Sequence, residues 1–173
     1  MPVLVRKIDW AKWEQKAELG EGEISADAIT GDLRTTKNRL SFWRCSTADI
    51  SELERAALAI AASRDQLDRL DLVYLEDAWI HESGLDTLPT PGNTPVSSLR
   101  DTHVDVHRLD LIRLNRVAEL VARAHRSNAG LKLSRLKVLS VLIKAVRNGL
   151  VEVDSLRGDL RSKVEAALGL SSG

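Results

Sequence analysis

Residues 39–76 read RLSFWRCSTADISELERAALAIAASRDQLDRLDLVYLE. Residues 39–45 alternate apolar and polar side chains and are rich in strand formers, and residues 70–76 repeat this pattern. Between them, residues 51–63 are rich in alanine and place apolar side chains at helical spacing. Strand, helix and strand in this order predict a parallel strand pair joined by a crossover helix. The first half of the chain is therefore predicted to be α/β.

The N-terminus predicts a further strand and a further helix. Residues 3–8 alternate apolar and polar side chains, which is typical of a short strand. Asp9 is placed to cap a helix over residues 10–19. Together with residues 39–76, these elements make a small N-terminal α/β unit of about three strands and two helices.

Residues 103–170 predict a C-terminal three-helix bundle. A first helix is expected over residues 109–126, where apolar side chains form one stripe. A second helix is expected over residues 134–148, with Ser134 as its N-cap. Asp154 is expected to cap the third helix, which Gly169 ends. The predicted fold class is therefore α+β or α/β.

A segment rich in proline and glycine separates the two predicted parts. Residues 83–102 contain three prolines and two glycines, and a loop of this length is usually a linker or a functional lid. The chain is therefore predicted to divide into an acidic α/β domain (1–82), a linker or lid (83–102) and a basic helical bundle (103–170). The last residues, 171–173, are expected to fray.

The net charge of zero conceals an opposite charge on each half of the chain. Residues 1–95 carry 11 Lys and Arg against 17 Asp and Glu, whereas residues 96–173 carry 14 against 8. No aromatic residue follows Trp79. Charge asymmetry between halves informs on partners rather than on fold.

Composition excludes several classes of protein. The single cysteine, Cys45, excludes an internal disulfide and a zinc site of several cysteines. No apolar run approaches the roughly 20 residues that cross a bilayer, so no membrane association is expected. The first 20 residues lack the apolar stretch of a signal peptide. We therefore expect a cytoplasmic protein.

The strongest surface pattern is a run of positive charge. Residues 108–147 contain ten Lys and Arg but only two acidic residues. The candidate partner-binding residues are Arg108, Arg113, Arg116, Arg123 and Arg126. Arginines in such an array bind phosphates or acidic protein surfaces. The partner is expected to be the acidic half of the same chain, a second copy, or another acidic protein. Nucleic acid is an alternative, although the helical half offers no aromatic side chain for stacking.

The sequence HVDVH at residues 103–107 has the chemistry of a metal site. On a strand, His103, Asp105 and His107 point to one face, and two imidazoles with a carboxylate suit zinc or another divalent metal. A solvated strand face is the simpler interpretation. With residues 83–102 as a lid, the cluster would make the chain a metal-dependent hydrolase.

A second candidate site combines positive charge with an aromatic side chain. Arg34, Lys37 and Arg39 precede Trp43, so a cationic loop could hold an anion while the indole stacks on a base. The glycine-rich arrangement that cradles phosphates is absent from the sequence. The alternative is a polar turn with Trp43 in the core.

No catalytic residue and no cofactor can be assigned from these patterns. We therefore expect a binding or regulatory protein that acts through protein–protein contacts rather than an enzyme, and that forms a homo-oligomer through its oppositely charged halves. By analogy with small proteins that lack motifs, an accessory, antitoxin-like or immunity-like role fits. The metal-dependent hydrolase and the nucleic-acid-binding protein are the alternatives.

Overall fold

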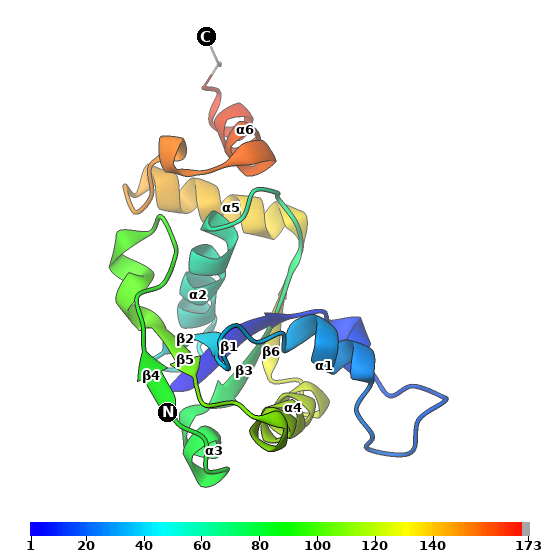
Figure 1. Ribbon diagram of the computed structural model, residues 1–173. Coiled ribbons are helices and arrows are strands. Elements are labelled where there is room, and N and C mark those ends of the chain that lie inside the picture. The colour runs from blue at the N-terminus through cyan, green and yellow to red at the C-terminus, as the bar shows by residue number, and fades with distance from the viewer. Residues whose placement is uncertain (171–173) are drawn as a thin grey trace.

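The chain folds around a six-stranded sheet in which every neighbouring pair of strands is antiparallel (Figure 1). The computed structural model describes residues 1–170, and the residues predicted above to fray, 171–173, lie outside this range. The strand order is β4-β5-β2-β1-β3-β6. The strands are β1 (Val3–Ile8), β2 (Leu40–Cys45), β3 (Leu70–Glu76), β4 (Thr87–Pro89), β5 (His103–Val106) and β6 (Gly130–Leu133).

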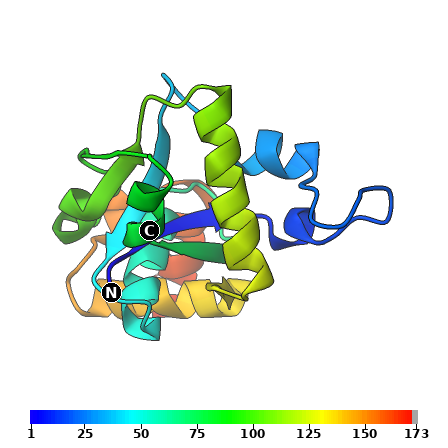
Figure 2. The ribbon, with the colours of Figure 1, turned by 90° about the horizontal axis from the view of Figure 1, so that it is seen from below.

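Helices cover both faces of the sheet (Figures 1 and 2). One face carries α2 (Ile50–Ala62), the short 3-10 helix η2 (Ser97–Thr102), α5 (Arg135–Arg147) and α6 (Gly158–Leu168). The other face carries the 3-10 helix η1 (Trp10–Trp13), α1 (Ala26–Asp32), α3 (Asp77–Glu82) and α4 (Leu111–Arg126). A further 3-10 turn, η3 (Val153–Ser155), precedes α6. No helix within residues 1–170 is long and apolar enough to cross a membrane.

Two hydrophobic cores form, one on each side of the sheet. Val5 and Leu72 belong to the core beneath α2 and α5, whereas Leu4 and Leu75 belong to the core beneath α4. Successive side chains of a strand point to opposite faces, so a strand that lies between two helix layers must be apolar on both faces. This is why Val3, Leu4 and Val5 are all buried, and why β1 lies inside the sheet.

The predicted small α/β unit followed by a three-helix bundle is wrong. β5 and β6 come from residues 103–170, but they pair with β2 and β3 and so extend the sheet on both sides. α4 and α5 lie on opposite sides of the sheet. α4 packs on β3, whereas α5 packs chiefly on α2 and α6, so the two helices do not form a bundle. The segment 83–102 also contributes β4 and η2.

The predicted parallel pairing of residues 39–45 with residues 70–76 is also wrong. β2 and β3 do run in the same direction and α2 connects them, as the sequence predicts. However, β1 lies between them and pairs antiparallel with both. The local pattern predicts the crossover, but it carries no information about a strand from another part of the chain that inserts there.

The predicted helix over residues 10–19 is reduced to the single turn of η1, and Asp9 does not cap it. The Asp9 carboxylate instead lies 3.6 Å from the Arg69 guanidinium. An ion pair with a distant residue therefore replaces the expected local hydrogen bond.

Of the two N-caps predicted in the C-terminal part, one is confirmed and one is wrong. Ser134 caps α5 as predicted, since its hydroxyl accepts a hydrogen bond from the Lys137 amide. Asp154 does not cap the last helix, because its carboxylate accepts a hydrogen bond from Arg161 and α6 begins only at Gly158. Gly169 ends α6 in the left-handed conformation, as predicted.

Candidate functional site

The predicted basic surface lies on and beside α4. The solvent face of this helix carries five residues at intervals of four and three, Ile112, Arg116, Glu119, Arg123 and Arg126. Helical periodicity places them in one stripe, opposite the buried Val117 and Val121. We call this stripe, with the flanking Arg108, Leu111 and Arg113, the α4 surface.

Neighbouring groups hold two of these arginines in place. The Arg116 guanidinium donates a hydrogen bond of 3.1 Å to the Ser83 carbonyl oxygen at the end of α3. The Arg123 guanidinium lies 4.0 Å from the centroid of the Trp79 ring, which is a cation–π contact. Both contacts orient a guanidinium without neutralising its positive charge.

The arginines of the α4 surface have no acidic partner. Within residues 1–170, no carboxylate oxygen lies within 4.0 Å of Arg108, Arg113, Arg116, Arg123 or Arg126. Within the described residues, these arginines therefore contact the first half of the chain through Ser83 and Trp79, but form no ion pair with its carboxylates.

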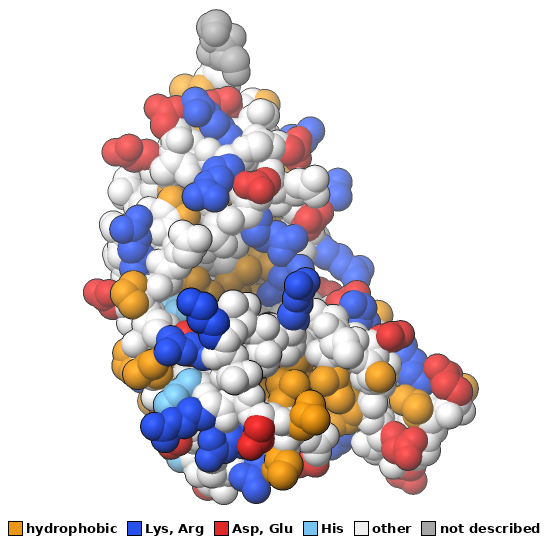
Figure 3. Space-filling model, viewed as in Figure 1, with side chains coloured by type: hydrophobic (Ala, Val, Ile, Leu, Met, Phe, Trp, Pro, Cys, Tyr) orange, Lys and Arg blue, Asp and Glu red, His pale blue; other side chains and the backbone are white. Residues whose placement is uncertain are grey.

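Exposed aliphatic side chains lie at the start of the same helix. Asp110 caps α4 by accepting a hydrogen bond of 2.8 Å from the Arg113 amide. The next two side chains, Leu111 and Ile112, are 85% and 68% exposed. Figure 3 shows Lys and Arg side chains beside a patch of hydrophobic side chains in the lower half of the molecule, where α4 lies. Apolar groups next to arginines are typical of protein-binding surfaces.

The connection between η1 and α1, together with the first two residues of α1, forms an exposed acidic loop, residues 14–27. It contains one lysine, Lys16, and five acidic residues, Glu14, Glu18, Glu21, Glu23 and Asp27. All five acidic residues are exposed, and none forms an ion pair within the part of the chain that the structure describes. Figure 2 shows this loop extending away from the rest of the molecule.

The residues of the predicted metal site lie on β5 and directly after it. His103 and Asp105 share one face of the strand, and His107 lies beyond the strand end. The Asp105 carboxylate accepts hydrogen bonds from the Ser41 and Thr90 hydroxyls at 3.0 and 3.2 Å, which links β5 to β2 and to the residue that follows β4. Among residues 1–170, no three His, Cys, Asp or Glu side chains are grouped to hold a metal ion. The geometry therefore gives no support to the metal site.

The predicted anion site is divided between a turn and the core. Lys37 and Asn38 form the centre of a tight turn, both with positive φ, and Arg34 and Arg39 are exposed on either side. Trp43 is buried in the core beneath α2 and is not available to stack on a base. This arrangement matches the alternative of a polar turn that precedes a core strand.

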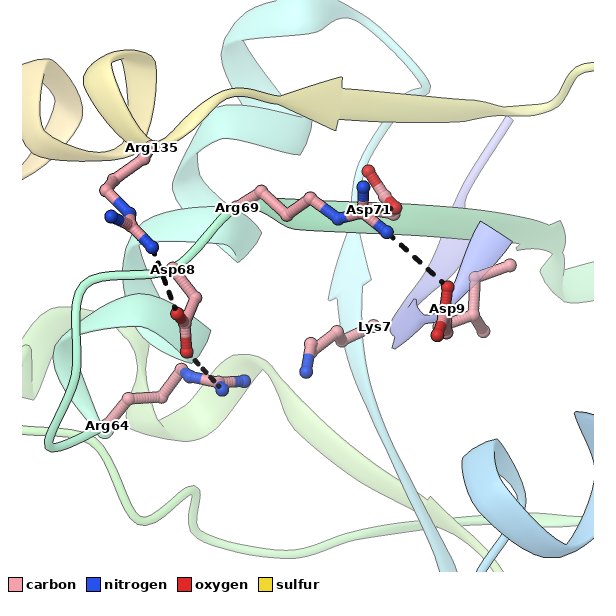
Figure 4. A pocket seen from close by; sticks show the side chains of 8 residues that line it. Lys7, Asp9, Arg64, Asp68, Arg69, Asp71 and Arg135 are labelled. Atoms are coloured by element: carbon pink, nitrogen blue, oxygen red, sulfur yellow. Dashed lines mark hydrogen bonds and ion pairs between the residues drawn. The ribbon is translucent and has the colours of Figure 1, made fainter. Parts of the chain in front are cut away.

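The structure also forms a charged pocket that the sequence patterns do not predict. It has a volume of about 530 Å³ and is lined by Lys7, Ile8, Asp9, Arg64, Asp68, Arg69, Asp71 and Arg135 (Figure 4). These residues come from the end of β1, the connection from α2 to β3, the start of β3, and the start of α5. The only local indication is the density of charge in residues 64–71, RDQLDRLD.

Comparison of the chain with protein-family models, curated proteins and solved structures found no significant match. The function is therefore inferred from the surfaces of this chain alone.

Proposed function

We propose that this chain is a binding protein that acts through protein–protein contacts, with the α4 surface as the contact site and the acidic loop of a second copy as the partner. The proposal is supported by two clusters of opposite charge, the arginines of the α4 surface and the carboxylates of the acidic loop. Within residues 1–170, none of the arginines of the α4 surface and none of the carboxylates of the acidic loop forms an ion pair. Opposite potentials of this kind steer association between molecules.

The expected affinity is modest and sensitive to salt. An exposed ion pair contributes only about 0–1 kcal/mol. Leu111 and Ile112 would each add about 1.5–3 kcal/mol if a partner covered them fully. The apolar contact would therefore supply most of the affinity, whereas the charges would select the partner and set the orientation.

The test is the mass of the intact protein in solution, measured by light scattering at several protein concentrations. We expect association in about 0.01 M NaCl, where the Debye length is about 30 Å. We expect dissociation in about 1 M NaCl, where the Debye length is about 3 Å.

Charge reversal identifies the surfaces that meet. A face variant, Arg116→Glu with Arg123→Glu, and a loop variant, Glu18→Lys with Glu21→Lys, should each be monomeric at low salt, because each presents like charges on both surfaces. Mixing the two variants should restore association, since the reversed face of one complements the reversed loop of the other.

A matched control reverses two exposed cations at the end of α5, Lys144→Glu with Arg147→Glu, and should associate as the natural sequence does. A monomer at every salt concentration would contradict the proposal, as would failure of the mixed variants to associate. A monomer that binds DNA at low salt, with affinity lost in the face variant, would assign the α4 surface to nucleic acid instead.

A further inference from the structure

The charged pocket shares no residue with the α4 surface or the acidic loop. Seven of its eight lining residues are ionisable, four of them cationic and three acidic. The excess of positive charge is concentrated in a recess of about 530 Å³, which is the size of a small-molecule site. Its chemistry must therefore be considered separately from the protein contact proposed above.

The ion pairs in the pocket do not use every N–H donor of its arginines. Asp68 lies between two arginines, 3.2 Å from Arg64 and 3.9 Å from Arg135. Arg69 lies 3.6 Å from Asp9 and 3.7 Å from the next carboxylate, on β3. Three of these four separations exceed the length of an N–H···O hydrogen bond. The guanidinium groups are therefore held near the pocket by attraction, and several of their N–H donors remain free for a ligand.

Lys7 is the one cation of the pocket that forms no ion pair with the residues that the structure describes. Within residues 1–170, its ammonium group has neither a carboxylate within 4.0 Å nor a hydrogen bond. Figure 4 shows the side chain extending toward the pair formed by Arg64 and Asp68. Burial is the main cause that lowers the pKa of Lys7. The Arg64 guanidinium lowers it further, whereas the carboxylates of Asp32, Asp68 and Asp9 raise it.

The start of α5 adds to the positive field of the pocket. Arg135 is the first residue of this helix, and Ser134 occupies only the Lys137 amide. The other amides of the first turn have no acceptor in the preceding turn of the helix, and the helix dipole is positive at this end. Lys7, Arg64 and Arg135, together with the start of α5, thus favour a ligand with more than one negative charge.

We propose that this pocket binds a small phosphorylated molecule that also carries hydroxyl groups, such as a sugar phosphate. The phosphate would contact Lys7, Arg64 and Arg135, because a dianion uses several cations at once. The hydroxyls would donate to the carboxylates of Asp9 and Asp71, which line the same pocket. No aromatic side chain lines the pocket, which favours a sugar over a nucleobase.

The test is a titration of the full-length protein with ribose 5-phosphate, inorganic phosphate and ribose, at ionic strength kept constant with NaCl. Amide chemical shifts follow binding and also report whether each variant is folded. We expect saturable shifts around the pocket with ribose 5-phosphate, weaker binding of inorganic phosphate, and no binding of ribose. Lys7→Gln should weaken binding of ribose 5-phosphate about tenfold or more, since it removes a charge-assisted hydrogen bond.

The matched control, Lys144→Gln, removes an exposed lysine far along α5 and should bind ribose 5-phosphate as the natural sequence does. Absence of saturable shifts with ribose 5-phosphate would overturn the proposal, and so would equal affinity of the Lys7→Gln variant. Equal affinity for inorganic phosphate and ribose 5-phosphate would overturn the role of the hydroxyl groups. None of these results depends on whether the chain associates through the α4 surface.

Discussion

Asp32 joins three segments of the chain through its side chain and its backbone. Its carboxylate accepts hydrogen bonds of 2.8 Å from the Asp9 amide and from Trp13 Nε1. Its carbonyl oxygen accepts two hydrogen bonds from the Arg6 guanidinium, at 3.0 and 2.6 Å. Arg6 is partly buried, and desolvation lowers its pKa to about 10. One residue at the end of α1 thus holds η1 and β1 in place.

Asp32→Ala should lower the free energy of unfolding by about 2–3 kcal/mol, because two partly buried donors lose their acceptor. Asp32→Asn should cost less, since the amide keeps one acceptor oxygen. Urea denaturation followed by tryptophan fluorescence measures both values. Equal losses for the two variants would mean that the negative charge, rather than acceptance of hydrogen bonds, stabilises this site.

Cys45 is predicted to be unreactive in the native protein. Its thiol is buried, donates to the Glu52 carbonyl oxygen, and has a pKa raised from 9.0 to about 12, chiefly by burial. A disulfide reagent at pH 8 should therefore label the unfolded protein quickly and the native protein only on unfolding. The raised pKa also contributes stability below pH 9 that is lost as pH rises toward 12. Labelling of the native protein as fast as the unfolded protein would contradict this prediction.

At the scale of elements, the pairing of β3 with β6 depends on a close approach of two chain segments. A Cβ atom at Gly130 would lie 2.2 Å from the Leu72 carbonyl oxygen and 2.5 Å from the Trp10 ring. The same ring also contacts His125, with the two ring centroids 4.6 Å apart. Gly130, the first residue of β6, is therefore required by packing.

Gly130→Ala should destabilise the protein by about 3 kcal/mol or more, because backbone on one side and a packed indole on the other must move. The control is Gly20→Ala, where the new methyl group would meet only the flexible Glu23 side chain. Chemical denaturation measures the loss, and near-ultraviolet circular dichroism reports the displaced tryptophan. A Gly130→Ala variant as stable as the control would show that β6 can shift without cost.

The whole molecule is expected to unfold in a single cooperative transition. Each core combines residues from both halves of the sequence, with Val5 and Leu142 in one and Leu4 and Val117 in the other. All four tryptophans lie in the first half, whereas α4, α5 and α6 lie in the second. Tryptophan fluorescence and far-ultraviolet circular dichroism should therefore give the same midpoint in urea. Separate midpoints would indicate two independent units.

Patterns within one element were sufficient to predict part of the α4 surface. Arginines three, four or seven residues apart on a helix share a face wherever that helix packs, so Arg116, Arg123 and Arg126 could be grouped in advance. The charged pocket could not be predicted, since Lys7, Arg64 and Arg135 lie on segments that are distant in the sequence. Their convergence depends on how β1, α2 and α5 meet.

The sequence by itself determined the helices with a clear apolar stripe, the Ser134 cap, and the strands of residues 3–8, 39–45 and 70–76, because these depend on neighbours a few residues away. The tertiary structure decided the position of β1 between β2 and β3, and the addition of the short strands β4, β5 and β6 to the sheet. Three or four residues form a strand only where an existing edge offers hydrogen bonds. The edge that receives β6 is formed by residues about sixty positions earlier in the chain, so no local pattern could predict it.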